Sequence, residues 1–273
     1  MPAAGDEEQL AVDDMLIKRV QSGVSAFELV YRPSSFWPRS SPQSTTGPTA
    51  LAILDSSFNP PTRAHLALAS AAGEATEARL LLLSVRNADK ALAPGDATYA
   101  QRLAMMRLIA EDANAAVGLV DAPTFVGKAE VLLEAYSTTL GSAAPERPGL
   151  IFLLGFDTLE RLLAPRYYGS SDAMRAALSQ FFASEGHNAS VICARRIMTG
   201  ETSTSEDKER ELVGLAGEIG GPGRVSLVDI GDDLARYSSS EVRKRVKEGQ
   251  SEWQSLVTKR VADYIEQHRL YRD

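Results

Sequence analysis

The sequence predicts an α/β protein built on a doubly wound parallel sheet of about five or six strands, with helices after the last strand. Two observations support this prediction. Short, nearly continuous apolar runs recur between residues 50 and 230, as expected of strands that are covered on both faces. Segments with helical periodicity separate the runs, and this alternation is typical of βαβ units, which form parallel sheets.

Before the first of these runs, residues 1–48 are predicted to form an N-terminal appendage. Leu10, Ile17 and Val20 indicate a weakly amphipathic helix, and residues 26–31 alternate like a strand. Residues 33–48 are rich in Pro and Ser, which favours a linker or an exposed loop. We therefore divide the chain into residues 1–48, a candidate arm for a protein partner, and residues 49–273, the main domain.

The elements of the main domain follow one another in a regular order. The predicted strands are the apolar runs at residues 50–54, 79–85, 116–120, 149–154, 190–194 and 225–230. The predicted helices between them lie at residues 65–78, 99–112, 128–140 and 172–184. Residues 198–224 are expected to form a loop around one short helix. Two further helices are expected near the end, at residues 239–247 and 252–268.

Composition restricts the classes of function. The net charge of −7 argues against a general nucleic-acid surface, which needs clustered Lys and Arg. The single cysteine, Cys193, excludes a disulfide within one chain and a two-cysteine metal site. No apolar run approaches the ~18 residues of a membrane span, and the acidic N-terminus lacks a signal pattern. We expect no membrane partner and a cytoplasmic protein, with the nucleus as a second compartment.

The clearest candidate site is the polar turn at residues 56–65, which follows the first predicted strand and begins a helix. Ser57 and Asn59 offer short side chains that can bind ligand oxygens, and Pro60-Pro61 stiffens the chain before the helix. His65 lies in the first helical turn, where it could donate a hydrogen bond to a phosphoryl oxygen as charge develops there. The alternative is an ordinary β–α turn with a capping Asn and a surface His.

A second turn of this kind lies at residues 238–243, after the last predicted strand. Ser238 and Ser239 can cap a helix and still present backbone amides outward. Arg243 is four residues after Ser239 and shares its helix face, so it could clamp a polyphosphate. A capped, solvated helix with a basic face is the alternative. Both turns would lie at the carboxyl edge of the sheet, where ligands of open α/β sheets bind.

Single residues after three other strands complete the candidate site. Gly155 permits close backbone approach, and Asp157 could accept hydrogen bonds from ribose hydroxyls, unless it only caps a helix. Lys90 could neutralise a substrate phosphate, although a surface Lys is the default, and Arg195 could be a second clamp on a triphosphate. The patterns GxGxxG, Walker A and HExxH are absent, which excludes typical dehydrogenases, P-loop enzymes and zinc proteases, and no metal-ligand cluster is evident.

The motifs together resemble those of the HxGH-type nucleotidyltransferases, and within them the nicotinamide mononucleotide adenylyltransferases. The GSFNPxTxxH segment of that family corresponds to residues 56–65, its GxD segment to residues 155–157 and its ISSTxIR segment to residues 237–243. Residues 264–271 resemble the C-terminus of the family. The resemblance covers roughly residues 49–273, which it identifies as a nucleotidyltransferase domain.

This resemblance implies a Rossmann-like fold and an activity in NAD biosynthesis. ATP would transfer its adenylyl group to nicotinamide mononucleotide by direct in-line attack on the α-phosphorus, giving NAD⁺ and pyrophosphate, with Mg²⁺ held mainly by the ATP phosphates. His65 and Arg243 would be catalytic. Together with the residues singled out above, the predicted ATP site comprises Ser57, Phe58, Thr62, His65, Gly155, Asp157, Arg195, Ser238, Ser239 and Arg243. The predicted acceptor site comprises Lys90, Phe125 and Tyr168.

Several positions depart from the family pattern, among them Tyr237 and Ser240 in place of Ile and Thr. Ser56 stands where the family has Gly, which places a Cβ where the backbone normally approaches the ligand. Tyr168 matches one of the tryptophans on which the family stacks nicotinamide, and Phe125 is near the other. These changes are typical of a divergent branch, which we expect to be fungal. Two alternatives follow: the same chemistry on another phosphate acceptor such as nicotinate mononucleotide, or a nucleotide-binding regulator or weak ATPase that has lost transfer.

Overall fold

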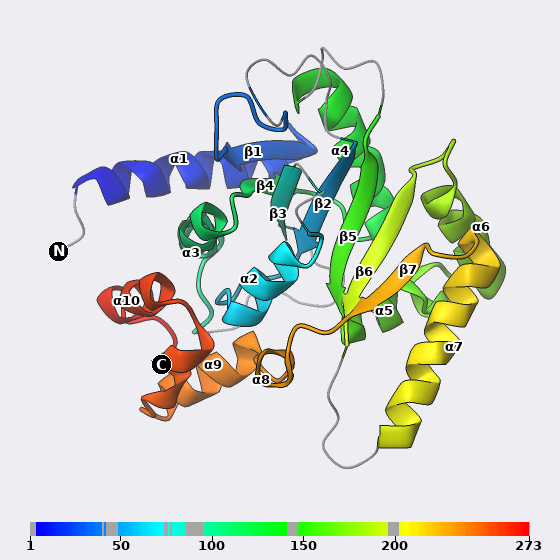
Figure 1. The fold of residues 1–273 in the computed structure, drawn as a ribbon. Coiled ribbons are helices and arrows are strands. Elements are labelled where there is room, and N and C mark those ends of the chain that lie inside the picture. The colour runs from blue at the N-terminus through cyan, green and yellow to red at the C-terminus, as the bar shows by residue number, and fades with distance from the viewer. Residues whose placement is uncertain are drawn as a thin grey trace.

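The computed structural model describes residues 4–39, 41, 49–73, 76, 78–85, 95–140, 147–195 and 202–272. In this part of the chain a seven-stranded sheet lies between two layers of helices (Figure 1). The strand order is β1-β4-β3-β2-β5-β6-β7, and every neighbouring pair is parallel except β1 and β4. The predicted doubly wound α/β fold is therefore confirmed.

All six predicted strands are present, and a seventh strand precedes them. The bounds are β1 (Phe27–Tyr31), β2 (Ala50–Asp55), β3 (Ala78–Ser84), β4 (Ala116–Val120), β5 (Gly149–Gly155), β6 (Ala189–Ala194) and β7 (Val225–Val228). In β2, Ala52 and Leu54 face one hydrophobic cluster, while Leu51 and Ile53 face the other. Because each face of the strand is buried, its sequence is continuously apolar rather than alternating.

The helices divide between the two faces of the sheet (Figure 1). On one face lie α1 (Ala4–Gln21), α2 (Arg63–Ser70), α3 (Tyr99–Asp112), α9 (Ser239–Lys247) and α10 (Lys259–Gln267). On the other lie α4 (Phe125–Ala135), α5 (Phe156–Leu162), α6 (Ser171–Phe182) and α7 (Thr202–Gly220). Shorter elements are α8 (Asp232–Ala235), a π-helical turn (Tyr136–Leu140) and 3₁₀ turns at Pro165–Tyr167 and Glu252–Leu256. In the described residues, no helix is long and apolar enough to cross a membrane.

The described part of the N-terminal segment packs on this same sheet. Strand β1 pairs antiparallel with the edge strand β4, which adds one strand to the predicted number. Helix α1 packs on α3, where the fully buried Asp13 forms an ion pair with Arg107. The division of the chain at residue 48 and a partner-binding role for residues 1–48 stay predictions.

Three predicted elements differ from the structure. The helix expected at residues 65–78 spans only Arg63–Ser70, and β3 begins at Ala78. The loop expected at residues 198–224 is largely the 19-residue helix α7, whose Leu212, Leu215 and Ala216 pack on the core. The helix expected at residues 252–268 is divided into a 3₁₀ turn and α10, because Thr258 caps a new helix through its hydroxyl.

The strand order reverses direction at β2, which has β3 on one side and β5 on the other. In open α/β sheets, ligands bind beyond the carboxyl ends of the strands at such a switch point. Strand β2 ends at Asp55 and β5 ends at Gly155. The fold therefore places the turn at residues 56–62 and the segment 155–157 at the expected ligand-binding position.

Candidate active site

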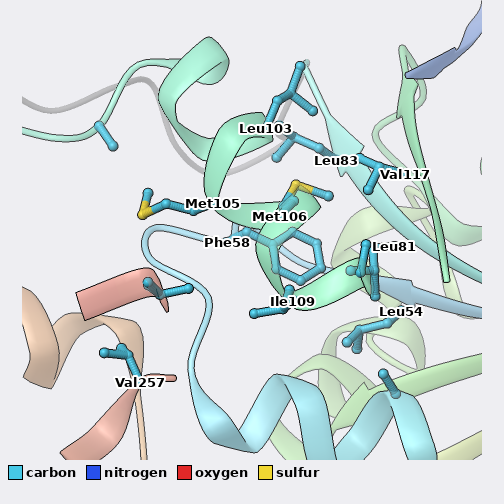
Figure 2. Close-up of a cluster of buried hydrophobic side chains, with 14 of the residues drawn as sticks. Leu54, Phe58, Leu81, Leu83, Leu103, Met105, Met106, Ile109, Val117 and Val257 are labelled. Carbon is cyan, nitrogen blue, oxygen red and sulfur yellow. The ribbon is translucent and has the colours of Figure 1, made fainter. Parts of the chain in front are cut away.

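The turn after β2 is anchored in the hydrophobic core by Phe58. Its side chain is fully buried, and Figure 2 shows its ring among Leu81, Met106 and Ile109. The backbone at Phe58 has a φ of 45°, a left-handed conformation that costs a non-glycine residue about 1–3 kcal/mol. The buried aromatic ring holds this conformation in place. Only the backbone of Phe58 is therefore available to a ligand.

His65 lies at the start of α2 and is held through both ring nitrogens. The backbone N–H of Thr62 donates to Nδ1 at 3.0 Å, and Nε2 lies 2.9 Å from Oγ of Ser56. Because Nδ1 accepts a hydrogen bond, the ring proton of the neutral form is on Nε2. Burial lowers the pKa of the His65 imidazole to about 4. At neutral pH, His65 is therefore an uncharged donor that presents its Nε2–H toward Ser56.

The two turns predicted from the sequence are hydrogen-bonded to each other. Oγ of Ser239, in the first turn of α9, donates to the carbonyl oxygen of Pro60 at 2.7 Å. Nη1 of Arg243 donates to the carbonyl oxygen of Asn59 at 2.6 Å. The hydroxyl of Ser238 accepts from a backbone N–H and caps the helix. Segments that are about 180 residues apart in the sequence thus form one structure at the carboxyl edge of the sheet.

A second guanidinium group, which the sequence did not indicate, joins Arg243. The carboxylate of Asp96 lies between them, 3.4 Å from Nε of Arg243 and 3.6 Å from Nη2 of Arg102. Nη1 of Arg102 also donates to the carbonyl oxygen of Ser57, at 3.4 Å. Burial lowers the pKa of Arg102, but a guanidinium keeps its proton in proteins. Two permanent cations therefore lie beside the turn.

Two cavities adjoin at this turn. The first, of about 270 Å³, is lined by residues of the turn and by Arg243, Phe125 and Tyr168. The second, of about 660 Å³, is lined by His65 and by the ends of β5 and β6. The residues that line both cavities are Asp55, Ser56, Thr158, Arg161 and Ser239. Two ligands can therefore bind side by side with this set of residues between them.

The structure brings most of the predicted site residues to these cavities. Those lining the second cavity are His65, Gly155, Asp157, Arg195, Ser238 and Ser239, and those lining the first are Ser57, Phe125, Tyr168, Ser239 and Arg243. Thr62 and Phe58 line neither cavity, because both side chains are fully buried behind the turn. Lys90 lies outside the described residues.

The wall of the second cavity has room for a ligand against the backbone. No atom outside the immediate neighbours lies within 4 Å of the position that a Cβ on Gly155 would occupy. A side chain there would project into the cavity, so the glycine leaves the backbone open to a flat ligand. Arg195, which follows the β6 residue paired with Gly155, also lines this cavity and pairs with Glu209 at 2.6 Å. The guanidinium is half exposed, and the buried Glu209 carboxylate orients it.

The first cavity has an aromatic side. Phe125, the first residue of α4, packs edge-on against Phe152 with ring centroids 5.5 Å apart. The hydroxyl of Tyr168 donates to the carbonyl oxygen of Leu162 at 2.8 Å, and burial raises the pKa of Tyr168 to about 12. Both rings are fixed by these contacts and can present a flat apolar surface to a ligand ring.

Sequence reasoning missed several residues that line the cavities. Asp55 and Lys128 form an ion pair in the first cavity. Thr158, in the first turn of α5, and Arg161, in its last turn, line both cavities. Asp55 directly follows the strand predicted at residues 50–54 and could have been found by its position. Lys128 and Arg161 lie inside helices, where nothing in the local sequence separates them from solvent-facing residues.

The arrangement suits anionic ligands and charge stabilisation. Guanidinium groups, serine hydroxyls and the Nε2–H of His65 are hydrogen-bond donors to phosphate oxygens. Within the described ranges, no group of three or more His, Cys, Asp or Glu residues could hold a metal ion. The guanidinium, hydroxyl and imidazole groups of the cavities are donors that can bind phosphate oxygens directly.

A doubly wound sheet with two polar turns at the carboxyl ends of its strands, beside the switch point, is typical of nucleotide-binding α/β proteins. A family described as cytidylyltransferase-like matches residues 53–245, and the chain belongs to this family.

Similar proteins carry more specific names. A putative nicotinamide mononucleotide adenylyltransferase of Schizosaccharomyces pombe is 32% identical over 164 residues, which are 59% of either chain. A probable nicotinate-nucleotide adenylyltransferase of Dehalococcoides mccartyi is 32% identical over 133 residues, 48% of this chain and 53% of that protein. The chain thus matches less than two thirds of the length of these two relatives. A probable nicotinate-nucleotide adenylyltransferase of Gloeobacter violaceus is 27% identical over 229 residues, 81% of this chain and 95% of that protein.

A solved structure supports the fold. The nicotinic acid mononucleotide adenylyltransferase of Plasmodium falciparum, complexed with NaAD, superposes with a TM-score of 0.53. The alignment covers 82% of this chain and 97% of that one, at 16% sequence identity. At this identity the likeness establishes a shared architecture.

Proposed function

We propose that the chain transfers the adenylyl group of ATP to nicotinamide mononucleotide, giving NAD⁺ and pyrophosphate. The observation that carries the proposal is the pair of adjoining cavities, which meet at two hydrogen-bonded phosphate-type turns. The names of the similar proteins support a pyridine mononucleotide as the acceptor. We assign ATP to the cavity of His65 and Gly155 and the acceptor to the cavity of Phe125 and Tyr168.

The reaction would occur between the two cavities. An oxygen of the acceptor 5′-phosphate attacks the α-phosphorus of ATP, a new P–O bond forms, and the bond to the β-phosphate oxygen breaks in line with it. Pyrophosphate leaves, and no covalent intermediate with the protein is required. The chain contributes by holding both ligands at the shared wall, where Ser239 and Arg161 line both cavities.

His65 and Arg243 have distinct parts in this mechanism. The neutral His65 donates its Nε2–H to an oxygen of the α-phosphoryl group as negative charge grows there. Arg243 and Ser239, held by the turn, bind oxygens of the leaving pyrophosphate. Mg²⁺, held mainly by phosphate oxygens, would supply further charge neutralisation, and the carboxylates of Asp55 and Asp157 line the same cavity as His65.

The proposal is tested with the purified chain, ATP, nicotinamide mononucleotide and Mg²⁺, by chromatography of the products. We expect NAD⁺ to form and His65→Ala to lower kcat by about 10²–10³, or about 2.7–4 kcal/mol, since it removes one donor to the developing charge. NAD⁺ formation that is no faster than with His65→Ala would contradict the proposal. Nicotinate mononucleotide in the same assay tests the alternative acceptor, which the relatives named for nicotinate nucleotide support.

One contact favours a second candidate function, a nucleotide-binding regulator that has lost transfer. Oγ of Ser56 lies 2.9 Å from Nε2 of His65 and takes the hydrogen bond that the mechanism gives to a phosphoryl oxygen. Tight binding of ATP in a calorimeter, without acceptor-dependent release of pyrophosphate, would support this function in place of transfer.

A further inference from the structure

The floor of the first cavity holds a buried pair of opposite charges. Nζ of Lys128, in the first turns of α4, lies 2.5 Å from Oδ2 of Asp55, the last residue of β2. Their side chains are only 6% and 11% exposed, yet both residues line the cavity. Burying two charges costs free energy, and two apolar side chains of similar size would stabilise the fold at least equally. A pair of this kind at a ligand cavity is a candidate for recognising the ligand.

The cavity has two chemically different sides, and the pair lies on one of them. Arg102 and Arg243, from α3 and α9, form the cationic side beside the phosphate-type turn. Phe125 and Tyr168 form the aromatic side. Nζ of Lys128 lies over the Phe125 ring, 5.0 Å from its centroid. An acceptor mononucleotide in this cavity would place its 5′-phosphate at the wall shared with the ATP cavity, lined by Arg161 and Ser239, and its ring on the aromatic side near Lys128.

We propose that the Asp55–Lys128 pair determines acceptor specificity by selecting a ring that carries a neutral carboxamide over one that carries a carboxylate. This inference rests on the proposed function and names the residues that choose between its two acceptors. The ammonium has three N–H donors and the carboxylate has several lone pairs, so each keeps hydrogen-bonding capacity after they pair. Lys128 donates to the amide oxygen, and Asp55 accepts from the amide N–H₂ group.

A ring that carries a carboxylate interacts less favourably with the Asp55–Lys128 pair than a ring that carries a carboxamide. Its attraction to Lys128 is opposed by its repulsion from Asp55, and it offers no N–H group for the Asp55 oxygens. The pair is neutral as a whole, so it does not compensate for the loss of hydration of a third charge. Asp55 thus disfavours a ring that carries a carboxylate, and Lys128 favours it. Removing the carboxylate should admit an anionic ring, and removing the ammonium should exclude it.

The test compares kcat/KM for nicotinamide mononucleotide with kcat/KM for nicotinate mononucleotide in the full chain. We expect the wild type to favour the nicotinamide compound. Asp55→Asn should move the ratio toward nicotinate by at least about tenfold, and Lys128→Met should move it the other way by a similar factor. General damage to the protein lowers both rates together, so it leaves the ratio unchanged.

A matched control removes one charge from a lysine pair outside both cavities. Glu160 forms an ion pair with Lys208 and lines neither cavity. Glu160→Gln should leave the ratio of the two acceptors as in the wild type. Equal ratios in the wild type, Asp55→Asn and Lys128→Met would overturn the inference, as would a wild type that prefers nicotinate mononucleotide.

Binding separates this inference from the proposed function. If the wild type forms neither dinucleotide, the transfer function fails, and calorimetry with the two mononucleotides then measures the same preference as a ratio of Kd values. A shift of about tenfold toward nicotinate mononucleotide in Asp55→Asn supports the inference. Unchanged Kd ratios, or no binding of either mononucleotide, overturn it.

Discussion

At the scale of single residues, the site depends on the hydrogen bonds of one imidazole. The amide of Thr62 fixes the tautomer of His65, so that Nε2 is the donor, and burial keeps the ring neutral by lowering its pKa to about 4. Because the imidazole is already neutral, its charge and its Nε2–H donor do not change between pH 6 and 8. The Nε2–H of His65 donates to the hydroxyl of Ser56, at 2.9 Å.

Ser56→Gly is predicted to raise kcat several-fold. The substitution removes the hydroxyl that accepts from Nε2 of His65 and opens space beside the turn. The measurement is the steady-state rate of dinucleotide formation with saturating ATP and acceptor. A lower kcat in Ser56→Gly would mean that the Ser56 hydroxyl positions the imidazole productively.

The stability of the protein should depend on pH through His65. The unfolded chain binds a proton at this residue below pH 6.5, whereas the folded chain does so only near pH 4. Stability therefore falls as the pH decreases from 6.5 to 4, by at most about 3 kcal/mol from this group. Urea unfolding of the wild type and of His65→Gln at several pH values measures the effect. Between pH 6.5 and 4, the free energy of unfolding should fall more in the wild type than in His65→Gln. An equal fall in both proteins would contradict the prediction.

At the scale of elements, α9 is positioned by hydrogen bonds to a turn that precedes it by about 180 residues. Arg243→Lys should raise the KM for ATP about tenfold, because Lys keeps the charge but loses the planar fork that binds the Asn59 carbonyl and Asp96 together. The control is Arg245→Lys on the same helix, where the guanidinium pairs with Glu241 and lines neither cavity. Equal effects of the two substitutions would contradict a specific role for Arg243.

Helix α1 should contribute to the stability of the whole sheet. Asp13 is fully buried and its carboxylate binds Arg107 of α3, with one contact of 2.5 Å. Asp13→Asn removes a fully buried carboxylate and leaves the partly buried Arg107 guanidinium without its counterion, which should cost about 3 kcal/mol, measured by urea unfolding. Asp14→Asn, at the exposed neighbouring position, should change the free energy of unfolding by less than about 0.5 kcal/mol. Similar values for both would mean that α1 is an independent appendage.

At the scale of the whole molecule, the sequence predicted what depends on local pattern. Strands buried on both faces have continuous apolar runs, and the two phosphate-type turns are contiguous motifs, so both were recognisable. Strand β1 was expected only as part of an appendage, because its pairing with β4 is set by tertiary contacts. Helix α7 was missed because its first half is polar and its apolar residues lie toward its end.

The site beyond the motifs could not be predicted for the same reason. Arg102 and Lys128 lie inside helices and reach the cavity only because those helices pack at the carboxyl edge of the sheet. Phe58 belongs to the predicted phosphate motif, yet its ring is in the core, since the left-handed backbone turns it away from the ligand side. A motif thus identifies the segment, while packing decides which atoms of it face the cavity.

The most direct test of the proposed transfer is a rapid-quench single turnover with excess protein, Mg²⁺, labelled ATP and nicotinamide mononucleotide. If ATP and the acceptor bind side by side and react directly, pyrophosphate and NAD⁺ will appear at the same rate and in equal amounts, and neither will form without the acceptor. Release of pyrophosphate at the same rate without the acceptor, or bound ATP that stays intact in its presence, would contradict adenylyl transfer as the function of these two cavities.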